Sequence, residues 1–364
     1  MKILELSPSL APGGAERFTV DLSNELAKNH DVTILVMRKF QNSDFYKNEL
    51  SEKLHYIQEN GTFSKISKLL QLFKVLYWIF RLKPDIVHAH TIGVNWLFLP
   101  SFLYPKAKYF FTIHNLANQE CTTKLGFHLR SFLFRRNVKA ISISNVCYQS
   151  FKDFFGFPCF ANIDNGCREI ETTDRLPETI REMESYKVNA DTKVFVNIAR
   201  IMPQKNHQLL IKSFNQFVKQ GNNAVLLIIG DYKHYPEAKK ELDKLVNTER
   251  IHFLGTRNNV ADYLFKADYF CLSSAWEGLP ISLLEAGLSG CYPISTPAGG
   301  VVDVIINESW GIITKDFTEE SYLKALDMAY TIKYDKEEIR KLYYSKFSMK
   351  VCAEKYNNLF QKHN

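Results

Sequence analysis

The chain has 364 residues, of which 46% are hydrophobic and 23% are charged. This length suits two domains better than one core, and the composition excludes an intrinsically disordered chain. The seven cysteines lack paired spacing and have mostly apolar neighbours, which favours reduced, buried thiols over a disulfide framework or a zinc site.

The formal net charge of +7 lies entirely in the N-terminal half. Residues 1–165 hold 20 Lys and Arg against 13 Asp and Glu, and the remaining 26 basic residues balance 26 acidic ones. A positive half-molecule indicates an anionic membrane surface or an acidic acceptor as partner. Nucleic acid is disfavoured, because no recognisable binding motif accompanies the charge.

Short apolar runs alternate with helical patterns through the first half of the chain, which is typical of parallel α/β layers. We expect strands at 3–7, 32–37, 85–90, 109–114, 140–144 and 160–164. We expect helices at 15–28, 65–82, 95–103, 122–135 and 145–155.

The segment 65–83 is rich in leucine and aromatic residues, but lysines and arginines interrupt it. It therefore falls short of the roughly 20 apolar residues that a bilayer crossing needs. A buried helix against the sheet is the first interpretation. The alternative is a basic, aromatic helix in the membrane interface, which segment 127–139 would extend.

Residues 167–191 are charged and irregular, which predicts an interdomain linker between domains at 1–166 and 192–347. The α/β pattern restarts beyond it, with strands expected at 194–199, 225–230, 251–254, 269–272, 292–295 and 311–314. The last segment, 348–364, carries a helical apolar stripe. Two Rossmann-like, doubly wound domains place a ligand cleft between the carboxyl ends of both sheets.

Two glutamates lie eight residues apart where a strand at 268–274 is expected to give way to a helix. Glu277 precedes the helix, and Glu285 lies inside it. Pro280 suits a helix start, and Gly290 suits its end. Amides at this start would bind an anion, and the carboxylates would bind hydroxyls, as a nucleotide-sugar requires. The expected backbone donors are Gly278, Leu279 and Ile281.

Two cations follow the first strand of the second domain. Arg200 ends that strand, and Lys205 lies five residues later in the loop. Together they would neutralise a diphosphate and stabilise its departure. Solvated loop charges are the alternative.

The first domain offers a glycine loop and several histidines. Gly13 and Gly14 follow the first strand and open the first helix, where glycines let a ligand approach the backbone. His88 and His90 share a strand face and suggest a metal pair. No carboxylate or third histidine is near them in the sequence, and no Asp-x-Asp occurs, so we predict no metal.

The spacing of Glu277 and Glu285, followed by Ala286, resembles the E-x7-E motif of retaining glycosyltransferase family 4, whose fold is GT-B. The chain is also similar to this family in its R-x4-K pair and its GGAE loop. Further matches are Phe253, Gly255 and Val260, residues 297–300, and the Asn165-Gly166 turn.

This resemblance implies a role for each matched residue. Glu277 would bind the hexose, Glu285 the ribose, and Gly255 and Val260 the base. Arg200, Lys205 and the Gly13–Gly14 loop would bind the diphosphate, and His114 would lie near the transferred sugar. The implied catalytic set is Glu277, His114, Arg200 and Lys205. The terminal helix would return to the first domain.

The sequence thus predicts a cytoplasmic, metal-independent, retaining transferase that uses no cofactor. Its donor would be a nucleotide-diphosphate sugar. Its acceptor would be a glycan or a lipid-linked molecule, reached from the inner face of the plasma membrane. The alternatives are a nucleotide-sugar epimerase, a non-catalytic nucleotide-sugar-binding module and a glycoside hydrolase.

Overall fold

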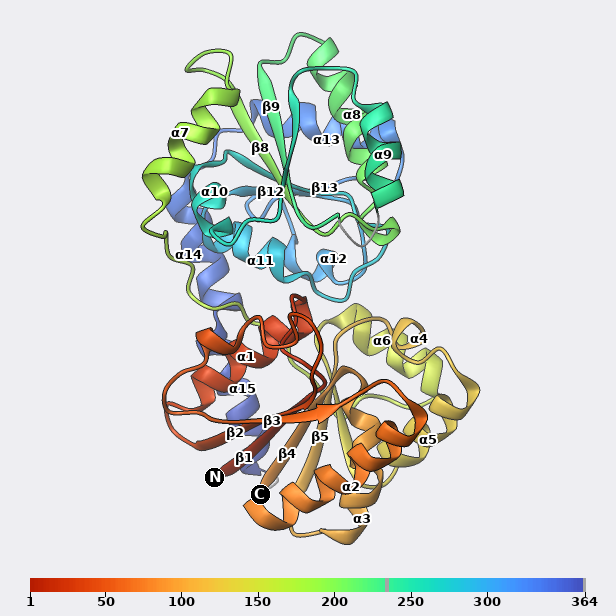
Figure 1. Cartoon of the computed structure of the whole chain (residues 1–364). Helices are drawn as coiled ribbons and strands as arrows, with labels where there is room; N and C mark the ends of the chain where they lie inside the picture. Colours follow the sequence, from red (N-terminus) through yellow and green to blue (C-terminus); the bar gives the residue numbers. More distant parts are fainter. Residues whose placement is uncertain (233–235, 363–364) are drawn as a thin grey trace. The chain divides into compact units, whose positions relative to one another are not determined.

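The computed structural model describes residues 1–232 and 236–362, apart from the side chains of Lys65 and Lys68. The chain forms two compact units (Figure 1). The first contains Met1–Arg168 and Phe347–Asn364, and the second contains Glu169–Lys346.

The first unit is built on a seven-stranded parallel sheet with the order β3-β2-β1-β4-β5-β6-β7. The strands are β1 Lys2–Ser7, β2 Asp31–Arg38, β3 His55–Gly61, β4 Ile86–His90, β5 Lys108–Ile113, β6 Val138–Ser142 and β7 Ala161–Asn162. We did not predict β3. It is an edge strand whose side chains are mostly part-exposed, so it lacks the apolar run that marks its neighbours.

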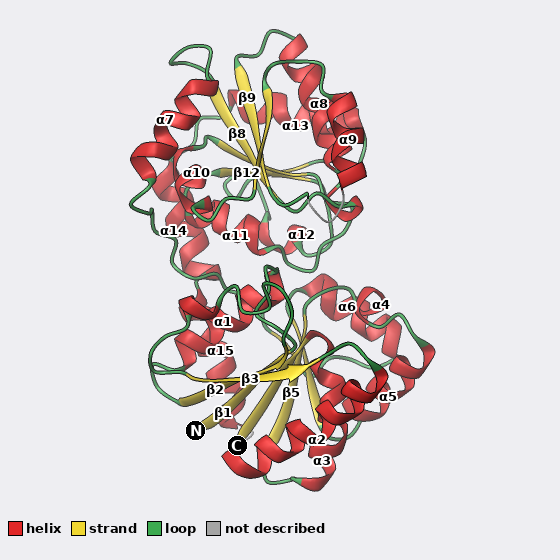
Figure 2. Ribbon diagram, viewed as in Figure 1, coloured by secondary structure: helices red, strands yellow, loops and turns green. Residues whose placement is uncertain are grey.

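Helices cover both faces of this sheet (Figure 2). They are α1 Gly14–Leu26, α2 Lys65–Leu82, α3 Phe98–Leu103, α4 Ala117–Glu120, α5 Lys124–Phe134, α6 Asn145–Phe155 and α15 Met349–Lys362, with 3-10 turns η1 Lys47–Glu49 and η2 Thr91–Leu97. Leu4 of β1 packs into one apolar cluster with α2, α5 and α6, whereas Ile3 packs into another with α1 and α15. Successive side chains of β1 therefore point to opposite faces of the sheet, and each face is covered by its own set of helices.

The C-terminal helix α15 lies against α1 within the first unit. Tyr356 and Phe360 are fully buried there. Gly166 permits the approach, because a Cβ at this position would collide with Cys352 and Met349. The backbone of Cys167 hydrogen-bonds to Phe347 and Met349 at the same place.

The second unit contains a six-stranded parallel sheet with the order β10-β9-β8-β11-β12-β13. The strands are β8 Lys193–Ile198, β9 Ala224–Ile229, β10 Ile251–Gly255, β11 Tyr269–Leu272, β12 Tyr292–Ser295 and β13 Ile312–Ile313. The helices are α7 Leu176–Tyr186, α8 His207–Lys219, α9 Pro236–Leu245, α10 Val260–Lys266, α11 Ile281–Leu288, α12 Val301–Val304, α13 Glu319–Thr331 and α14 Lys336–Phe347, with a 3-10 turn η3 Pro203–Lys205.

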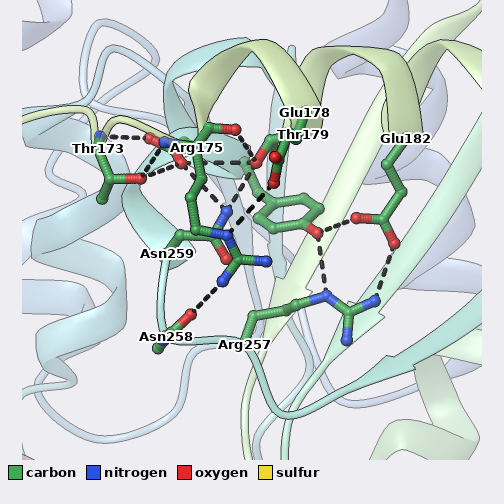
Figure 3. Close-up of polar contacts among 10 residues, drawn as sticks. Thr173, Arg175, Glu178, Thr179, Glu182, Arg257, Asn258 and Asn259 are labelled. Carbon is green, nitrogen blue, oxygen red and sulfur yellow. Dashed lines mark hydrogen bonds and ion pairs between the residues drawn. The ribbon is translucent and has the colours of Figure 1, made fainter.

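The prediction of an irregular linker at 167–191 was wrong, because this segment contains α7 and belongs to the second unit from Glu169 onward. Thr173, Arg175 and Glu182 of this segment bind α10 and the loop before it, although most of its charged side chains are exposed. The fully buried Asp262 accepts hydrogen bonds from the backbone N–H and the hydroxyl of Thr173, both at 2.7 Å. Glu182 of α7 pairs with Arg257 at 2.8 Å (Figure 3).

All seven cysteines are free and buried. Among the described residues, no helix combines the length and apolar character that membrane crossing requires.

Candidate functional site

The carboxyl edge of the second sheet carries a buried ion pair. Lys205 Nζ lies 2.6 Å from Glu277 Oε1, and the two side chains are only 16% and 7% exposed. The Ser274 hydroxyl donates to the same carboxylate oxygen at 2.6 Å. Lys205 follows β8 and Glu277 follows β11, and these strands are neighbours, so parallel pairing brings the two loops together.

The backbone around Glu277 is held by glycines and by the adjacent loop. Gly299 has φ of 57°, and a Cβ there would collide with the Glu277 carbonyl oxygen. The Gly300 N–H donates to the Gly278 carbonyl at 2.9 Å. Gln204 donates its side-chain amide to the Trp276 carbonyl at 2.8 Å. The Glu277 loop therefore contacts the loops after β8 and β12 at fixed positions.

Arg200 lies just beyond β8 and is exposed. Within the described part of the chain, its guanidinium forms no ion pair and no hydrogen bond, so its donors face solvent. Gly230 lies beside it after β9, where a Cβ would collide with the Ala199 carbonyl. Arg200 and Lys205 thus both follow β8. Arg200 is exposed, whereas Lys205 forms an ion pair with Glu277.

The helix α11 begins at Ile281, with Pro280 as the residue before it and not as its first helical residue. Gly290, with φ of 74°, follows its end as expected. Glu285 is partly exposed on this helix and has an interaction partner within the chain. Gly278 and Leu279 are buried and also have partners, so their availability as donors stays a prediction.

The proposed base-binding residues lie at the end of β10 and the start of α10. Gly255 closes β10 with φ of 70°, and Val260 opens α10. Gly255 thus adopts a backbone conformation that side chains disfavour. Both residues stand at the carboxyl edge of the same sheet as Lys205 and Glu277.

In the first unit, the glycine loop and His114 meet at the carboxyl edge of the sheet. Gly13 precedes α1, and Gly14, its first residue, is exposed. His114 directly follows β5 and is partly exposed. Phe18, one turn into α1, contacts the His114 ring edge-on at 5.4 Å between centroids. The buried Phe18 ring therefore packs α1 against His114.

Behind His114 lies a buried chain of hydrogen bonds. His114 Nε2 is 3.0 Å from His90 Nδ1, and His90 Nε2 is 2.8 Å from Glu5 Oε2. The same Glu5 oxygen is 3.0 Å from His88 Nδ1. His88 Nε2 lies 2.8 Å from the Thr112 hydroxyl, which pairs with the hydroxyl of Tyr356 in α15. Glu5, His88 and His90 have no exposed surface.

The charge of Glu5 sets the direction of these bonds. Burial alone would raise the pKa of Glu5, but His88 and His90 lower it to about 2. Burial, with His88, lowers the pKa of His90 to about 4. Neutral His90 must donate from Nε2 to the Glu5 carboxylate, so its Nδ1 is an acceptor. His114 therefore donates from Nε2 and presents Nδ1 as an acceptor.

This cluster corrects one step of the sequence interpretation. A carboxylate and a third histidine do accompany the His88–His90 pair, because Glu5 lies opposite His88 in the β1–β4 register and His114 follows the next strand. Ligand atoms of Glu5, His88 and His90 lie within 4.8 Å of one another, a spacing that a metal ion could use. Their mutual hydrogen bonds already satisfy these atoms without one.

Two residues that contact the candidate site escaped the sequence interpretation. Ser274 was seen only as the end of a strand, and Glu120 was not considered. One Glu120 oxygen accepts the His114 backbone N–H at 2.6 Å, and burial raises the pKa of Glu120 to about 7. A glutamate seven residues beyond a strand carries no signal of such a contact in the sequence.

Comparison with known proteins decides the family. A model of family 4 glycosyltransferases matches residues 12–166, and one of group 1 glycosyl transferases matches residues 178–344. A UDP-Gal:α-D-GlcNAc-diphosphoundecaprenol α-1,3-galactosyltransferase of Escherichia coli is 30% identical over 282 residues, 72% of this chain and 69% of that protein. The chain belongs to glycosyltransferase family 4.

Other relatives agree on family and fold. A diphospho-undecaprenol 4-α-N-acetylgalactosaminyltransferase of Campylobacter jejuni is 22% identical over 360 residues, 95% of this chain and 93% of that protein. The Anabaena protein HepE, solved with UDP-glucose, matches 100% of both chains with a TM-score of 0.82 and 18% identity. The two parallel-sheet units are those of the GT-B fold, and the chain is a glycosyltransferase.

Proposed function

We propose that this glycosyltransferase transfers a hexose-type sugar, with retention and without a metal ion, from a nucleotide-diphosphate sugar to a lipid-linked or glycan acceptor. The observation that carries the proposal is the buried Lys205–Glu277 pair beside exposed Arg200. This group of residues brings cations that can bind a phosphate and a carboxylate that can bind sugar hydroxyls to one edge of the sheet.

Each residue has a part in this reaction. Arg200 and Lys205 stabilise the charge that develops on the leaving diphosphate. Glu277 orients the sugar through its hydroxyls once Lys205 turns to the phosphate, and Glu285 binds the ribose. Gly255 and Val260 contact the base. For the first unit, the proposal is that the Gly13–Gly14 loop can bind a phosphate and that His114 can accept a hydrogen bond from a sugar hydroxyl at Nδ1.

This charge arrangement supports the proposed retention and metal independence. Ser274 donates to Glu277, and in the proposed complex the sugar hydroxyls occupy the same carboxylate, so Glu277 is poorly placed to act as a general base. The leaving phosphate oxygen can take the acceptor proton itself while the sugar is held in place. The two cations supply the charge that a divalent ion supplies in other transferases.

An anionic membrane surface is the proposed location of the acceptor. The helix α2 was expected to be buried, yet only one face packs on the core, through Val75 and Ile79. The other face carries an apolar stripe that is 48–75% exposed: Ile66, Leu69, Leu70, Phe73, Tyr77 and Phe80. Ring contacts of Phe80 with Tyr104, and of Phe102 with Phe132, continue the surface over α3 and α5.

The basic residues around this surface are not equivalent. Lys74 is already paired with Glu59, and Arg130 is buried. Arg81, Arg135 and Arg136 are exposed, each lying over an aromatic ring. These three remain for lipid headgroups, and Lys65 and Lys68 lie outside the described side chains. Such docking would place the enzyme at the inner face of the plasma membrane, from the cytoplasmic side.

The proposal is tested with purified protein, a panel of nucleotide-diphosphate sugars and a short prenyl-diphosphate-linked sugar as acceptor. Nucleoside diphosphate should appear only when acceptor is present, should continue in EDTA, and should accompany an α-linked product from an α-linked donor. Conversion of the donor without acceptor would indicate an epimerase or hydrolase. Tight donor binding without turnover across an acceptor panel would indicate a binding module.

A further inference from the structure

Arg38 is a buried cation at the carboxyl edge of the first sheet. It is the last residue of β2 and is 6% exposed. Its guanidinium lies between two aromatic rings, 4.6 Å from the centre of Phe63 and 5.5 Å from the centre of Trp96. Phe63 follows β3 and Trp96 follows β4, so the ends of β2, β3 and β4 all contribute to the surroundings of this cation. In doubly wound sheets this edge binds ligands.

No carboxylate of the described chain forms an ion pair with Arg38. Its hydrogen bond is from Nε to Gln71 Oε1, at a long 3.4 Å. Burial lowers its pKa from the ordinary value. Arg17 of the same unit shows the usual arrangement: it is equally buried and pairs with both Asp21 and Glu49. Among the described residues, the terminal nitrogens of Arg38 have no hydrogen-bond partner and are not fully enclosed, so an anion can reach them.

The surrounding residues hold the guanidinium in one orientation. Gln71 donates its amide to the Thr62 carbonyl at 2.9 Å and to the Ser67 hydroxyl at 3.1 Å, which leaves its oxygen for Arg38. Gly61 makes room, because a Cβ there would press on Gln71. The planar fork of Arg38 is thus pre-organised, and its terminal N–H groups suit a phosphate.

The neighbourhood of Arg38 is apolar and exposed. Phe63 is 60% exposed and contacts Phe40, which is 40% exposed, at 5.7 Å between ring centroids. Ile66, at the start of α2, is 75% exposed. A ligand with an anionic head and an apolar tail fits this combination better than a free sugar or a peptide does.

We propose that Arg38 binds the phosphate or diphosphate of a lipid-linked acceptor, and that Phe63 and Phe40 contact the first carbons of its apolar chain. This inference rests on the proposed function and narrows its acceptor to anionic isoprenoid-type lipids. The Gln71 amide and the two aromatic rings position Arg38. They need not contact the diphosphate.

The test measures binding of farnesyl diphosphate to the full chain by titration calorimetry, with saturating nucleoside diphosphate present so that Arg200 and Lys205 are occupied. Arg38→Gln should weaken binding about tenfold or more, the loss expected for one charge-assisted contact. Arg181→Gln, at an exposed arginine of the second unit, is the control and should bind like the original chain. Farnesol should bind weakly to both variants.

Further arms separate the possible sources of the anion. Inorganic pyrophosphate should bind more weakly than farnesyl diphosphate, because it lacks the apolar chain. Vesicles rich in phosphatidylglycerol should bind the original chain and Arg38→Gln equally, since docking uses the α2 face. A loss of vesicle binding that matches the loss of farnesyl diphosphate binding would replace the acceptor site with a general lipid-headgroup site and overturn the proposal.

A second variant separates loss of the Arg38 contact from altered folding of the first unit. Phe63→Ala removes an exposed ring without opening the core, and it should weaken farnesyl diphosphate binding severalfold while pyrophosphate binding falls less. Unchanged farnesyl diphosphate binding in both variants would overturn the proposal. This result would leave the transferase function standing, because nucleoside diphosphate release with a glycan acceptor is measured separately.

Discussion

The two units treat their charges in different ways. The second unit places a cation and a carboxylate together at its sheet edge, as Lys205 and Glu277, with Arg200 exposed beside them. The first unit surrounds one anion, Glu5, with two histidines, and among the described residues Arg38 has no acidic partner. We interpret the second unit as built for a donor of constant chemistry and the first as specialised for one acceptor.

The largest expected effect is on acid stability, where the first unit should be the more sensitive. The folded-state pKa of His90 is about 4 against an ordinary 6.5, so only the unfolded chain takes up this proton between those values. Stability is therefore full above pH 6.5 and falls by about 3 kcal/mol as the pH approaches 4. Glu5, with its pKa near 2, adds a further loss below pH 4.5.

The free energy of unfolding is measured in urea at pH 7 and pH 4.5. Hydrogen exchange of the β1 and β8 amides then reports the stability of each unit separately. The second unit has its own lowered histidine, His207, with a pKa of about 4 caused by burial and then by Lys205. His207→Leu should remove the loss in β8 and leave that in β1. His55→Gln, at an exposed histidine, is the control and should change neither. Equal acid stability of β1 at both pH values would contradict this account.

Most strands could be predicted from the sequence, because the buried strands of a parallel sheet appear as short apolar runs. The helices at 65–82 and 145–155 were predicted at their observed bounds. The edge strand β3 and the charged helix α7 were missed for a shared reason: both are stabilised by contacts with distant residues. The Asp262–Thr173 bonds that hold the segment before α7 join positions 89 residues apart, and no local pattern reports them.

The candidate site divides in the same way. The residues around Glu277 and Lys205 were found because the donor motif has fixed spacing, although their mutual ion pair was not foreseen. Glu5 was missed because its contact with His88 depends on the register of β1 against β4, which the sequence does not contain. Arg38 was missed because an arginine ending a strand is ordinary until the absence of an acidic neighbour is seen.

The second prediction concerns Glu277. Glu277→Gln should lower turnover on the order of 100-fold, because a neutral amide binds sugar hydroxyls less strongly and no longer attracts Lys205. Nucleoside diphosphate should still bind, as calorimetry would show. Glu320→Gln, in an exposed pair with Lys324, is the matched control. Near-normal turnover in Glu277→Gln would show that this residue has no role in the reaction.

Glu285→Ala should instead weaken nucleoside binding.

The third prediction separates the diphosphate from the nucleoside. Arg200→Ala and Lys205→Ala should each weaken nucleoside diphosphate binding about tenfold, and nucleoside binding much less, because the lost contacts are to phosphate oxygens. Lys324→Ala, at an exposed lysine of the same unit, should change neither affinity. Equal losses for both ligands in the two variants would reject the phosphate role.

The smallest expected effect concerns membrane docking, which should depend on the first unit alone. Phe73 is 53% exposed, and burying that face in lipid stabilises by about 1 kcal/mol, so Phe73→Ser should weaken vesicle binding roughly fivefold. Arg81, Arg135 and Arg136 should each contribute a similar amount on anionic vesicles. Lys74→Ala should matter less than these three, because Lys74 is paired with Glu59.

Phe317→Ser, at a 46% exposed phenylalanine of the second unit, is the matched control for co-sedimentation. Binding of the original chain should rise with phosphatidylglycerol content and fall with salt, because exposed charges are screened. An equal loss in Phe317→Ser and Phe73→Ser would mean nonspecific apolar adhesion. No binding to either neutral or anionic vesicles would place the acceptor in solution. The exposed face of α2 would then need a protein partner to cover it.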